Sequence, residues 1–219
     1  MRYAEALSLI GGLGKPSKMP WWSWSISATT CITGQKLAQV EGTTCSGCYA
    51  LKGNYRFSNV VEAQERRRLG SEDPNFVSAF VIVLTQLYRN QRRERAPGVP
   101  ENRFRWFDAG DLQSVEMLEK IVEIARLTPE IQHWLPTREL PIIRAYLARG
   151  GNFPNNLVVR VSSPKVGVAP KQRPFGLPIS TVGVDGDPTK QQCPALQQGN
   201  KCLSCDACWT TEDVNYHLH

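Results

Sequence analysis

The sequence predicts an α/β fold in which parallel βα units form a partial, incomplete barrel. Three observations favour this class. Strand-like and helix-like segments alternate through the middle of the chain, the strand-like segments are short and apolar, and too few of them occur for a closed eight-stranded barrel. We expect a single domain over residues 1–219, consisting of an amino-terminal cysteine segment (1–58), the βα partial barrel (59–190) and a carboxyl-terminal cysteine segment (191–219).

The elements follow a regular order after the amino-terminal segment, which has the character of loops and short elements rich in Gly, Ser and Trp. A helix is predicted at 59–69. A longer apolar helix is predicted at 71–91, because its first residues, SEDP, are typical of a helix start. Apolar residues then recur at helical spacing through 112–129. We expect strands at 103–111, 131–137, 156–163 and 180–187, with helices at 112–129 and 140–151.

Polar residues stand where the predicted strands end. Alternating strands and helices indicate right-handed βαβ units, and ligands bind such sheets at the carboxyl ends of the strands. The residues at these ends are Asp108 and Asp111, then Thr137, Arg138 and Glu139, then Ser162, Ser163 and Lys165, then Asp185 and Asp187. Asp111 directly precedes a helix and is expected to cap it. Asp108, Arg138 and Ser162 are therefore the candidate catalytic residues.

A net charge of +6 and a pI of about 9.0 make an acidic partner such as nucleic acid one expectation. The basic stretch 88–105 holds six arginines against two glutamates, and arginine suits phosphate groups. The aromatic residues Tyr88, Phe104 and Trp106 would stack on bases. The alternative is an ordinary solvated helix end and loop.

Membrane and export signals are not predicted. The chain has no apolar run of membrane-spanning length, so we expect no membrane partner. The first residues carry Glu5 and lack the apolar region of a secretory signal, which favours the cytoplasm. In that reducing compartment, clustered cysteines favour metal ligation over disulfides.

Seven cysteines fall into two groups at the ends of the chain. The groups are Cys31, Cys45 and Cys48, and Cys193, Cys202, Cys205 and Cys208. The C-x2-C-x2-C triplet of the second group is typical of [4Fe–4S] ligation, whereas zinc sites commonly pair two C-x2-C units. We therefore expect an iron–sulfur cluster there, with Cys193 as its fourth ligand and zinc as the alternative metal.

The amino-terminal group has only three cysteines, which would leave one iron of a second cluster open. Radical S-adenosylmethionine enzymes bind their cofactor at such an iron, with the spacing C-x3-C-x2-C; here the first gap has thirteen residues. Three arrangements stay open: a second cluster, a ligand lent to the first cluster, or a structural staple between the chain ends. Lys52 and Tyr55 follow this group and are expected to contact a cofactor.

Four segments together resemble the phage gene product 88 family: KMPWWSWSISATTCITGQKL, CSGCYALKGNY, FRWFDAGDLQS and CLSCDACW. The resemblance extends over about residues 15–217. Members of that family look like reduced relatives of radical S-adenosylmethionine barrels. The resemblance implies phage origin, metal bound by the seven cysteines, and the host-cell cytoplasm as location.

The expected function is that of an iron–sulfur protein, a radical or redox enzyme with one or two [4Fe–4S] clusters and S-adenosylmethionine as a candidate cofactor. The alternative is a nucleic-acid-binding phage protein in which a cluster or zinc is structural. A third reading is a phage factor that binds a host protein. The sequence leaves the substrate and the oligomeric state open.

Overall fold

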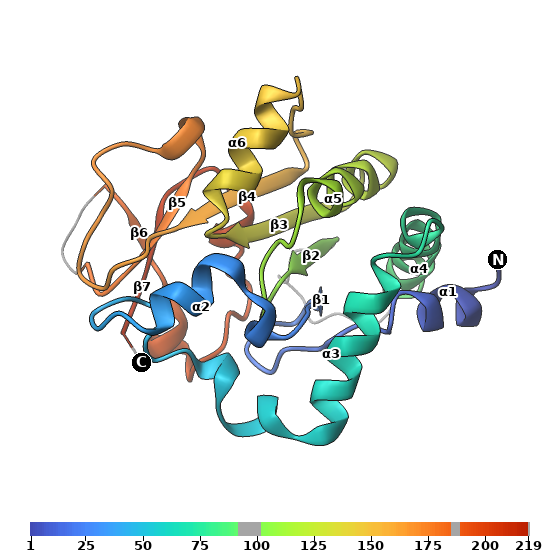
Figure 1. Ribbon diagram of the computed structural model, residues 1–219, viewed down its shortest axis with the longest axis horizontal. Coiled ribbons are helices and arrows are strands. Elements are labelled where there is room, and N and C mark those ends of the chain that lie inside the picture. Colours follow the sequence, from blue (N-terminus) through green and yellow to red (C-terminus); the bar gives the residue numbers. More distant parts are fainter. Residues whose placement is uncertain (92–101, 185–188, 219) are drawn as a thin grey trace.

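The chain is built around a seven-stranded sheet (Figure 1). The computed structural model describes residues 1–91, 102–184 and 189–218, and in this part all pairings between the strands are parallel. The strand order is β1-β2-β3-β4-β5-β7-β6, and the sheet is not closed. The predicted α/β class with an incomplete parallel sheet is confirmed. The strands are β1 (Trp22–Trp24), β2 (Arg103–Trp106), β3 (Gln132–Thr137), β4 (Leu157–Ser162), β5 (Ile179–Val182), β6 (Gln191–Gln192) and β7 (Val214–Tyr216).

The predicted helices are present, with some boundaries shifted. Helix α4 begins at Phe76 rather than at residue 71, because turns precede it; in one of them the Asp73 carboxylate accepts a hydrogen bond from the backbone N–H of Asn75. The α-helices of the described residues are α1 (Tyr3–Leu9), α2 (Ile32–Ala38), α3 (Ser58–Gly70), α4 (Phe76–Gln91), α5 (Val115–Leu127) and α6 (Leu140–Ala148).

The strands differ more from the prediction than the helices do. Strands β2 to β5 occupy the four predicted positions, but β2 ends at Trp106 instead of residue 111. The chain turns there because Phe107 and Gly110 adopt positive φ angles of 53° and 78°. Strands β1, β6 and β7 are additional. Each has three residues or fewer, which is too short for a visible alternation of apolar and polar residues.

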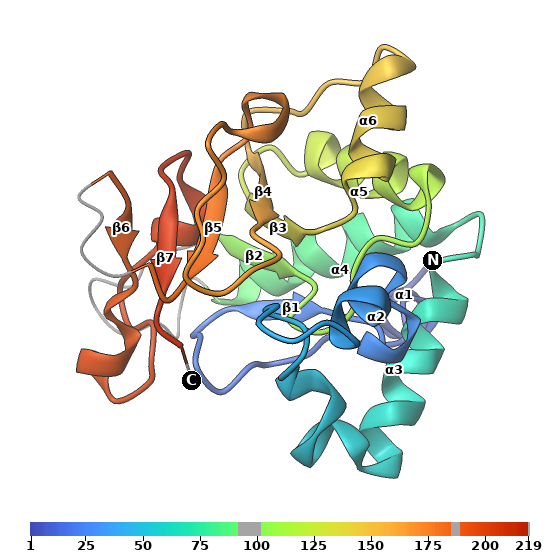
Figure 2. The same ribbon diagram turned by 60° about the vertical axis from the view of Figure 1, so that its left-hand side comes forward.

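Helices α4, α5 and α6 cover one face of the sheet, and the main core lies between them and the strands (Figures 1 and 2). Alternate residues of a strand point to opposite faces, and strands β1 to β4 supply the side chains of one face to this core. Those with little or no exposed surface are Trp24, Phe104, Trp106, Leu135 and Val159. The amphipathic spacing of α5 adds Leu118, Ile121 and Val122.

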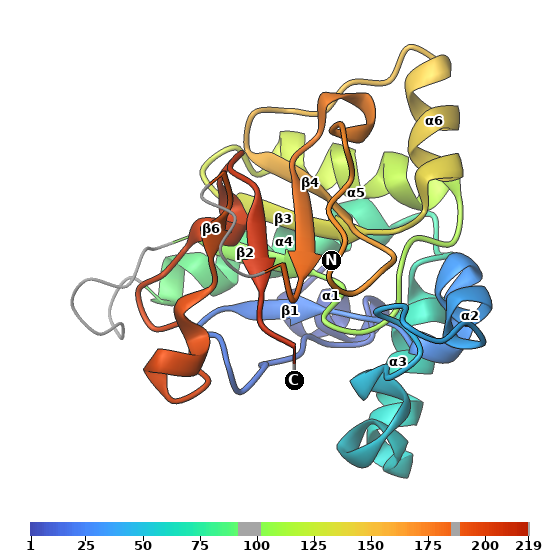
Figure 3. The same cartoon turned by 90° about the vertical axis from the view of Figure 1, so that its left-hand side faces the viewer.

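The loop between β6 and β7, residues 193–213, packs against the other face of the sheet (red in Figure 3). Met19, Trp21, Trp134 and Trp209 form a second apolar cluster there. Arg160 of β4 is fully buried, and its guanidinium fixes the loop by donating to four carbonyl oxygens. These acceptors are Ile179 (3.0 Å), Glu212 (2.6 Å), Ala207 (3.3 Å) and Thr210 (2.8 Å).

Helix α2 and the loop after it lie at the carboxyl edge of the sheet, next to the end of β3 (Figure 1). Glu139, just after β3, accepts hydrogen bonds from the backbone N–H and the hydroxyl of Thr33, both at 2.7 Å. The N–H of Thr44 donates to the carbonyl of Pro164 beyond β4 at 2.9 Å. The edge at which parallel sheets bind ligands is thus occupied by the amino-terminal cysteine segment.

Candidate functional site

The three amino-terminal cysteines lie together at this edge. Cys31 precedes α2, and Cys45 and Cys48 lie in the loop that follows it. A Cβ atom added to Gly34 would lie 3.5 Å from the Sγ atom of Cys31 and 3.9 Å from that of Cys45, so glycine preserves the space between the two thiols. Burial, followed by neighbouring charges that include thiolates at Cys48 and Cys45, raises the pKa of Cys31 to about 12.

Two buried carboxylates border this group of thiols. Asp111 accepts a hydrogen bond from the backbone N–H of Arg138 at 2.8 Å, yet burial raises its pKa to about 6. Both Asp111 and Glu139 contribute to the raised pKa of Cys31. Burial also raises the pKa of Cys45, and the guanidinium of Arg138 opposes that rise. The surroundings of the amino-terminal group are therefore more acidic than basic.

The prediction that Asp111 caps the helix at 112–129 is wrong. Helix α5 starts later, at Val115, and its N-cap is Ser114, whose hydroxyl accepts a hydrogen bond from the N–H of Met117 at 3.1 Å. The Asp111 carboxylate joins β3 instead, where the hydroxyl of Thr137 donates to it at 2.6 Å. Asp111 thus links the segment after β2 to the end of β3.

Asp108 is the centre of a hydrogen-bond network beyond β1 and β2. Its carboxylate accepts hydrogen bonds from the hydroxyl groups of Ser23 (2.7 Å), Ser25 and Tyr55 (3.0 Å). Burial works to raise the pKa of Asp108, but the Arg105 guanidinium and these hydroxyls outweigh it and hold the pKa below the usual range. Asp108 is therefore an ionised carboxylate whose oxygens are already engaged.

Two tyrosines join the Asp108 network to the thiols. Tyr49 directly follows Cys48, and its hydroxyl donates to the backbone carbonyl of Asp108. The residue as a whole is 60% exposed, and its ring meets the ring of Tyr55 edge-on at 5.7 Å. Tyr55 in turn packs beside Cys48 in a small apolar cluster. Of the predicted residues, Asp108, Arg138 and Tyr55 thus lie close to the amino-terminal cysteines.

The four carboxyl-terminal cysteines form a second group, on the face of the sheet opposite the helices. Burial, with thiolates at Cys193 and Cys205 nearby, raises the pKa of Cys202 to about 11. Burial likewise raises the pKa of Cys208 to about 12, and Cys193 adds to that rise. The Sγ atom of Cys208 lies 3.1 Å from the hydroxyl oxygen of Tyr216. The seven cysteines therefore form one group of three and one of four, and none is in a disulfide.

The family model described as Gene product 88 matches residues 4–211. The chain belongs to the Gene product 88 family. The matched range contains all seven cysteines, and the resemblance to this phage family is confirmed. No curated protein and no solved structure matches the chain.

The structure does not bring two predicted residues of this family member into the Asp108 network. Lys52 is exposed at the end of a short 3₁₀ turn beside the cysteine loop. Ser162 ends β4, and its hydroxyl accepts a long hydrogen bond from Ser180 at 3.4 Å. Asp185 and Asp187, at the predicted end of the fourth strand, lie outside the described residues.

The residues expected to stack on bases are core residues in this member of the Gene product 88 family. Tyr88 is 5% exposed, and Phe104 and Trp106 are fully buried, because the alternation along β2 turns both toward the helices. That part of the nucleic-acid prediction is wrong. Arg103 pairs with Asp206 at 2.7 Å. Residues 92–101 of the basic stretch 88–105 lie outside the described residues.

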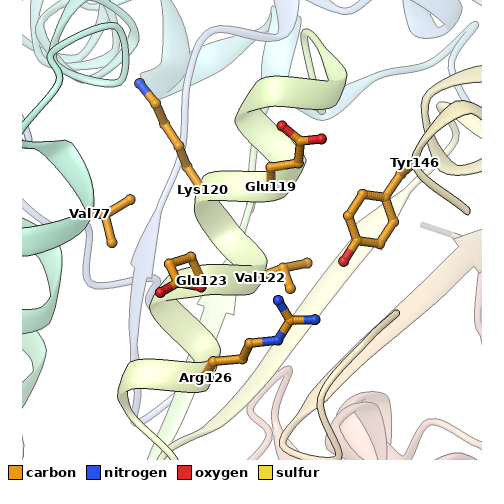
Figure 4. A pocket seen from close by; sticks show the side chains of 7 residues that line it. All are labelled: Val77, Glu119, Lys120, Val122, Glu123, Arg126 and Tyr146. Atoms are coloured by element: carbon orange, nitrogen blue, oxygen red, sulfur yellow. The ribbon is translucent and has the colours of Figure 1, made fainter. Parts of the chain in front are cut away.

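A shallow groove of about 350 Å³ lies on the helical side of the molecule, over α5 (Figure 4). The two basic side chains along it are already engaged. Lys120 donates to the carbonyl of Ser71 at 2.6 Å, and Arg126 donates to Asn152 at 2.9 Å and 2.8 Å. The groove lies away from both groups of cysteines.

Residues 1–91, 102–184 and 189–218 lack two further features. No three His, Cys, Asp or Glu side chains in these ranges already approach closely enough to surround one metal ion. No helix of the same ranges is long and apolar enough to cross a membrane.

Arg105, Tyr49 and Tyr216 were not predicted as site residues. Arg105 alternates with Phe104 and Trp106 along β2, so the two-residue period of a strand would have placed it on the face opposite the core. For Tyr49, the sequence signal for a site residue was weaker, because it consisted only of the position next to Cys48. Tyr216 belongs to the three-residue strand β7, whose pairing with β5 has no local signal in the sequence.

Proposed function

We propose that this member of the Gene product 88 family is an iron–sulfur protein with two cluster sites. The carboxyl-terminal site uses Cys193, Cys202, Cys205 and Cys208 to hold a [4Fe–4S] cluster. The amino-terminal site uses Cys31, Cys45 and Cys48 to hold a second cluster with one open iron. The observation that carries the proposal is where the cysteines lie: Cys31, Cys45 and Cys48 are at the carboxyl edge of the sheet, and the other four are in the loop on the face opposite the helices.

The chemistry of the two groups suits a cationic metal centre. Buried thiols that raise one another's pKa stay protonated on their own, and a metal ion is what makes such thiols into thiolate ligands. Burial raises the pKa of Cys31 and of Cys208 to about 12, so a bound metal would be needed to turn these two thiols into thiolate ligands. Gly34 adds a steric argument, since it keeps open the space that any larger residue would fill beside two of the thiols.

When bound, a cluster supplies one-electron transfer, and an iron without a protein ligand supplies a place for a small molecule. Around that place Arg138 would bind an anionic group, because its Nε atom is buried without a partner among the described residues. Asp108 would hold Tyr49 and Tyr55 in position rather than react itself. Ser162 and Lys52 would contact substrate and cofactor from the rim. S-adenosylmethionine is the candidate small molecule, and an enzyme of the radical type is the corresponding activity.

The first experiment measures iron, zinc and acid-labile sulfide per chain after purification without oxygen. We expect about eight irons for two cubane clusters. Cys205→Ala and Cys45→Ala should each remove about half of the iron and leave the other half, which makes each variant the control for the other. Zinc without sulfide would overturn the proposal.

The cofactor is tested on the loaded protein by binding of labelled S-adenosylmethionine and by the change it causes in the electron paramagnetic resonance spectrum. The wild type and Cys205→Ala should bind it. Cys45→Ala should not, because it lacks the cluster with the open iron. Equal binding to both variants would contradict the assignment of the amino-terminal site.

The second candidate function is nucleic-acid binding with a structural metal. It is favoured by the net charge of +6 and by the exposed Arg89 in the last turn of α4. Affinity for single- or double-stranded DNA or RNA would then fall steeply with salt, because neutralised phosphates release counterions. Absence of any salt-dependent binding would rule this function out.

A further inference from the structure

The carboxyl-terminal cysteines lie among hydrogen-bond donors and positive charges, whereas carboxylates border the amino-terminal ones. The donors come from strand residues that face away from the helices: Arg105 on β2, Trp134 on β3 and Tyr216 on β7. Arg160 on β4 adds a second guanidinium on this face. A thiolate site built in this way favours negative charge at its sulfur atoms.

Tyr216 makes the most direct contact. Its hydroxyl oxygen lies 3.1 Å from the Sγ atom of Cys208. When Cys208 is a thiolate ligand it has no proton to give, so the tyrosine O–H is the donor in this pair. The hydrogen bond therefore places the partial positive charge of the tyrosine hydroxyl proton next to a ligand sulfur atom.

The indole N–H of Trp134 is a hydrogen-bond donor without an acceptor among the described residues. The residue is 5% exposed, and its indole Nε1 is buried without a partner among the described residues. Its ring meets Trp209 edge-on at 5.1 Å, and these two tryptophans belong to the apolar cluster against which Cys202 and Cys208 pack. A buried N–H without an acceptor is unusual in a folded protein, and sulfur atoms of a cluster would satisfy it.

Arg105 brings a full positive charge to the same place. Its guanidinium lies over the ring of Trp134 at 4.6 Å and reaches the Sδ atom of Met19 at 3.9 Å. Its Nε atom is also buried without a partner in the described part of the chain.

We propose that Tyr216, Trp134 and Arg105 raise the reduction potential of the carboxyl-terminal cluster, so that this site accepts and stores an electron instead of only fastening the chain. This inference rests on the proposed function. The reduced form of a cluster carries one more negative charge than the oxidised form. Donors and cations at the sulfur atoms stabilise the reduced form more and raise the potential. These residues are positioning and tuning residues, not ligands.

The test is a redox titration with dithionite, followed by electron paramagnetic resonance, in a Cys45→Ala background that leaves one cluster to report. Tyr216→Phe and Trp134→Phe keep an aromatic ring and remove one donor each. Both should shift the midpoint potential to more negative values at unchanged iron content. Tyr146→Phe, which removes a hydroxyl that donates to the carbonyl of Asn152 on the helical side, is the matched control and should leave the potential unchanged.

Three results would contradict the inference in distinguishable ways. Unchanged potentials in both variants at full iron content would overturn this inference alone. A shift of the same size in Tyr146→Phe would overturn it too, because the effect would not be local. Purified protein with zinc and no sulfide would overturn the proposed function and, with it, the tuning of a cluster.

Discussion

The carboxylate of Glu139 accepts two hydrogen bonds from Thr33, a residue 106 positions earlier in the chain. One comes from the backbone N–H and the other from the hydroxyl, and both are 2.7 Å long. Glu139 is only 2% exposed, so these bonds form away from water. The pair fixes the first turn of α2, and with it the neighbouring Cys31, to the end of β3.

Replacing Glu139 by glutamine should therefore loosen the amino-terminal site. The amide keeps the shape of the side chain but loses the charge and one acceptor oxygen, so we expect the free energy of unfolding to fall by about 1–3 kcal/mol. Urea denaturation measures this. Glu119→Gln, which changes an exposed carboxylate 3.6 Å from Arg149, should leave the free energy unchanged. Equal effects of both variants would contradict the importance of the Thr33 contact.

Gly34→Ala should remove iron from the amino-terminal site without unfolding the protein. The new Cβ would lie 2.9 Å from the Cβ of Cys31, so Cys31 must shift from its present position. Gly47→Ala is the matched control. Gly47 lies between Cys45 and Cys48, yet a Cβ there meets nothing within 4 Å. We expect about half of the iron in the first variant and full iron in the second. Full iron in both would show that the space beside Gly34 is not needed.

Protein stability should fall in mild acid because of His133. The imidazole is fully buried, with Nδ1 3.3 Å from the donor Nε1 of Trp106 and Nε2 2.9 Å from the Thr128 hydroxyl. Burial lowers its pKa from 6.5 to about 3, so the unfolded chain binds a proton that the folded chain does not. Folding stability from this group is complete above about pH 6.5 and is lost as the pH falls toward 3.

The expected loss between about pH 7.5 and about pH 5.5 is about 1.4 kcal/mol. Urea denaturation at the two pH values measures it. His133→Gln removes the titrating group, so its own pH dependence should be smaller by that amount. A wild-type and variant difference that stays constant with pH would show that the buried imidazole is not responsible.

Arg160→Lys should detach the carboxyl-terminal cysteine loop from the sheet. Lysine has fewer donors than the guanidinium and cannot reach all four carbonyl oxygens, so we expect a loss of at least about 3 kcal/mol in unfolding free energy. The carboxyl-terminal cluster should also be lost more readily to a chelator. Arg149→Lys, at a half-exposed position near Glu116 and Glu119, is the control and should change neither property. Normal stability of Arg160→Lys would argue against this anchoring role.

Local patterns were enough to predict α5, β3 and β4. Buried residues recur at helical spacing in α5, and β3 and β4 are short apolar runs in which most residues are buried, as is typical of a parallel sheet. The spacing of the cysteines likewise predicted their two groups. Contacts between distant segments were not predictable in this way. The role of Asp111 was misjudged because a residue before a helix is a natural cap by local rules, whereas its hydrogen bond to Thr137 depends on the packing of β2 beside β3.

Strand β2 illustrates what local sequence patterns can predict and what they cannot. The strand was predicted correctly from the sequence, but Phe104 and Trp106 were interpreted as surface aromatic residues beside basic residues. Whether an aromatic side chain faces solvent or the core depends on which face the helices cover, and that is decided by α4 and α5. The same uncertainty concealed Arg105, whose environment is created by Trp134 and by the loop that packs over it.

Strand β7 comes after β6 in the chain but lies between β5 and β6 in the sheet. During synthesis, β5 must therefore keep an unpaired edge until residues 214–216 have left the ribosome, and β6 has no neighbour before then. In the described part of the chain, the backbone hydrogen bonds of the amino-terminal cysteine loop reach no later than Val166, so this segment can be arranged earlier. The two halves of the molecule thus mature at different times, and a chain interrupted before β7 presents an open strand edge that invites aggregation or proteolysis.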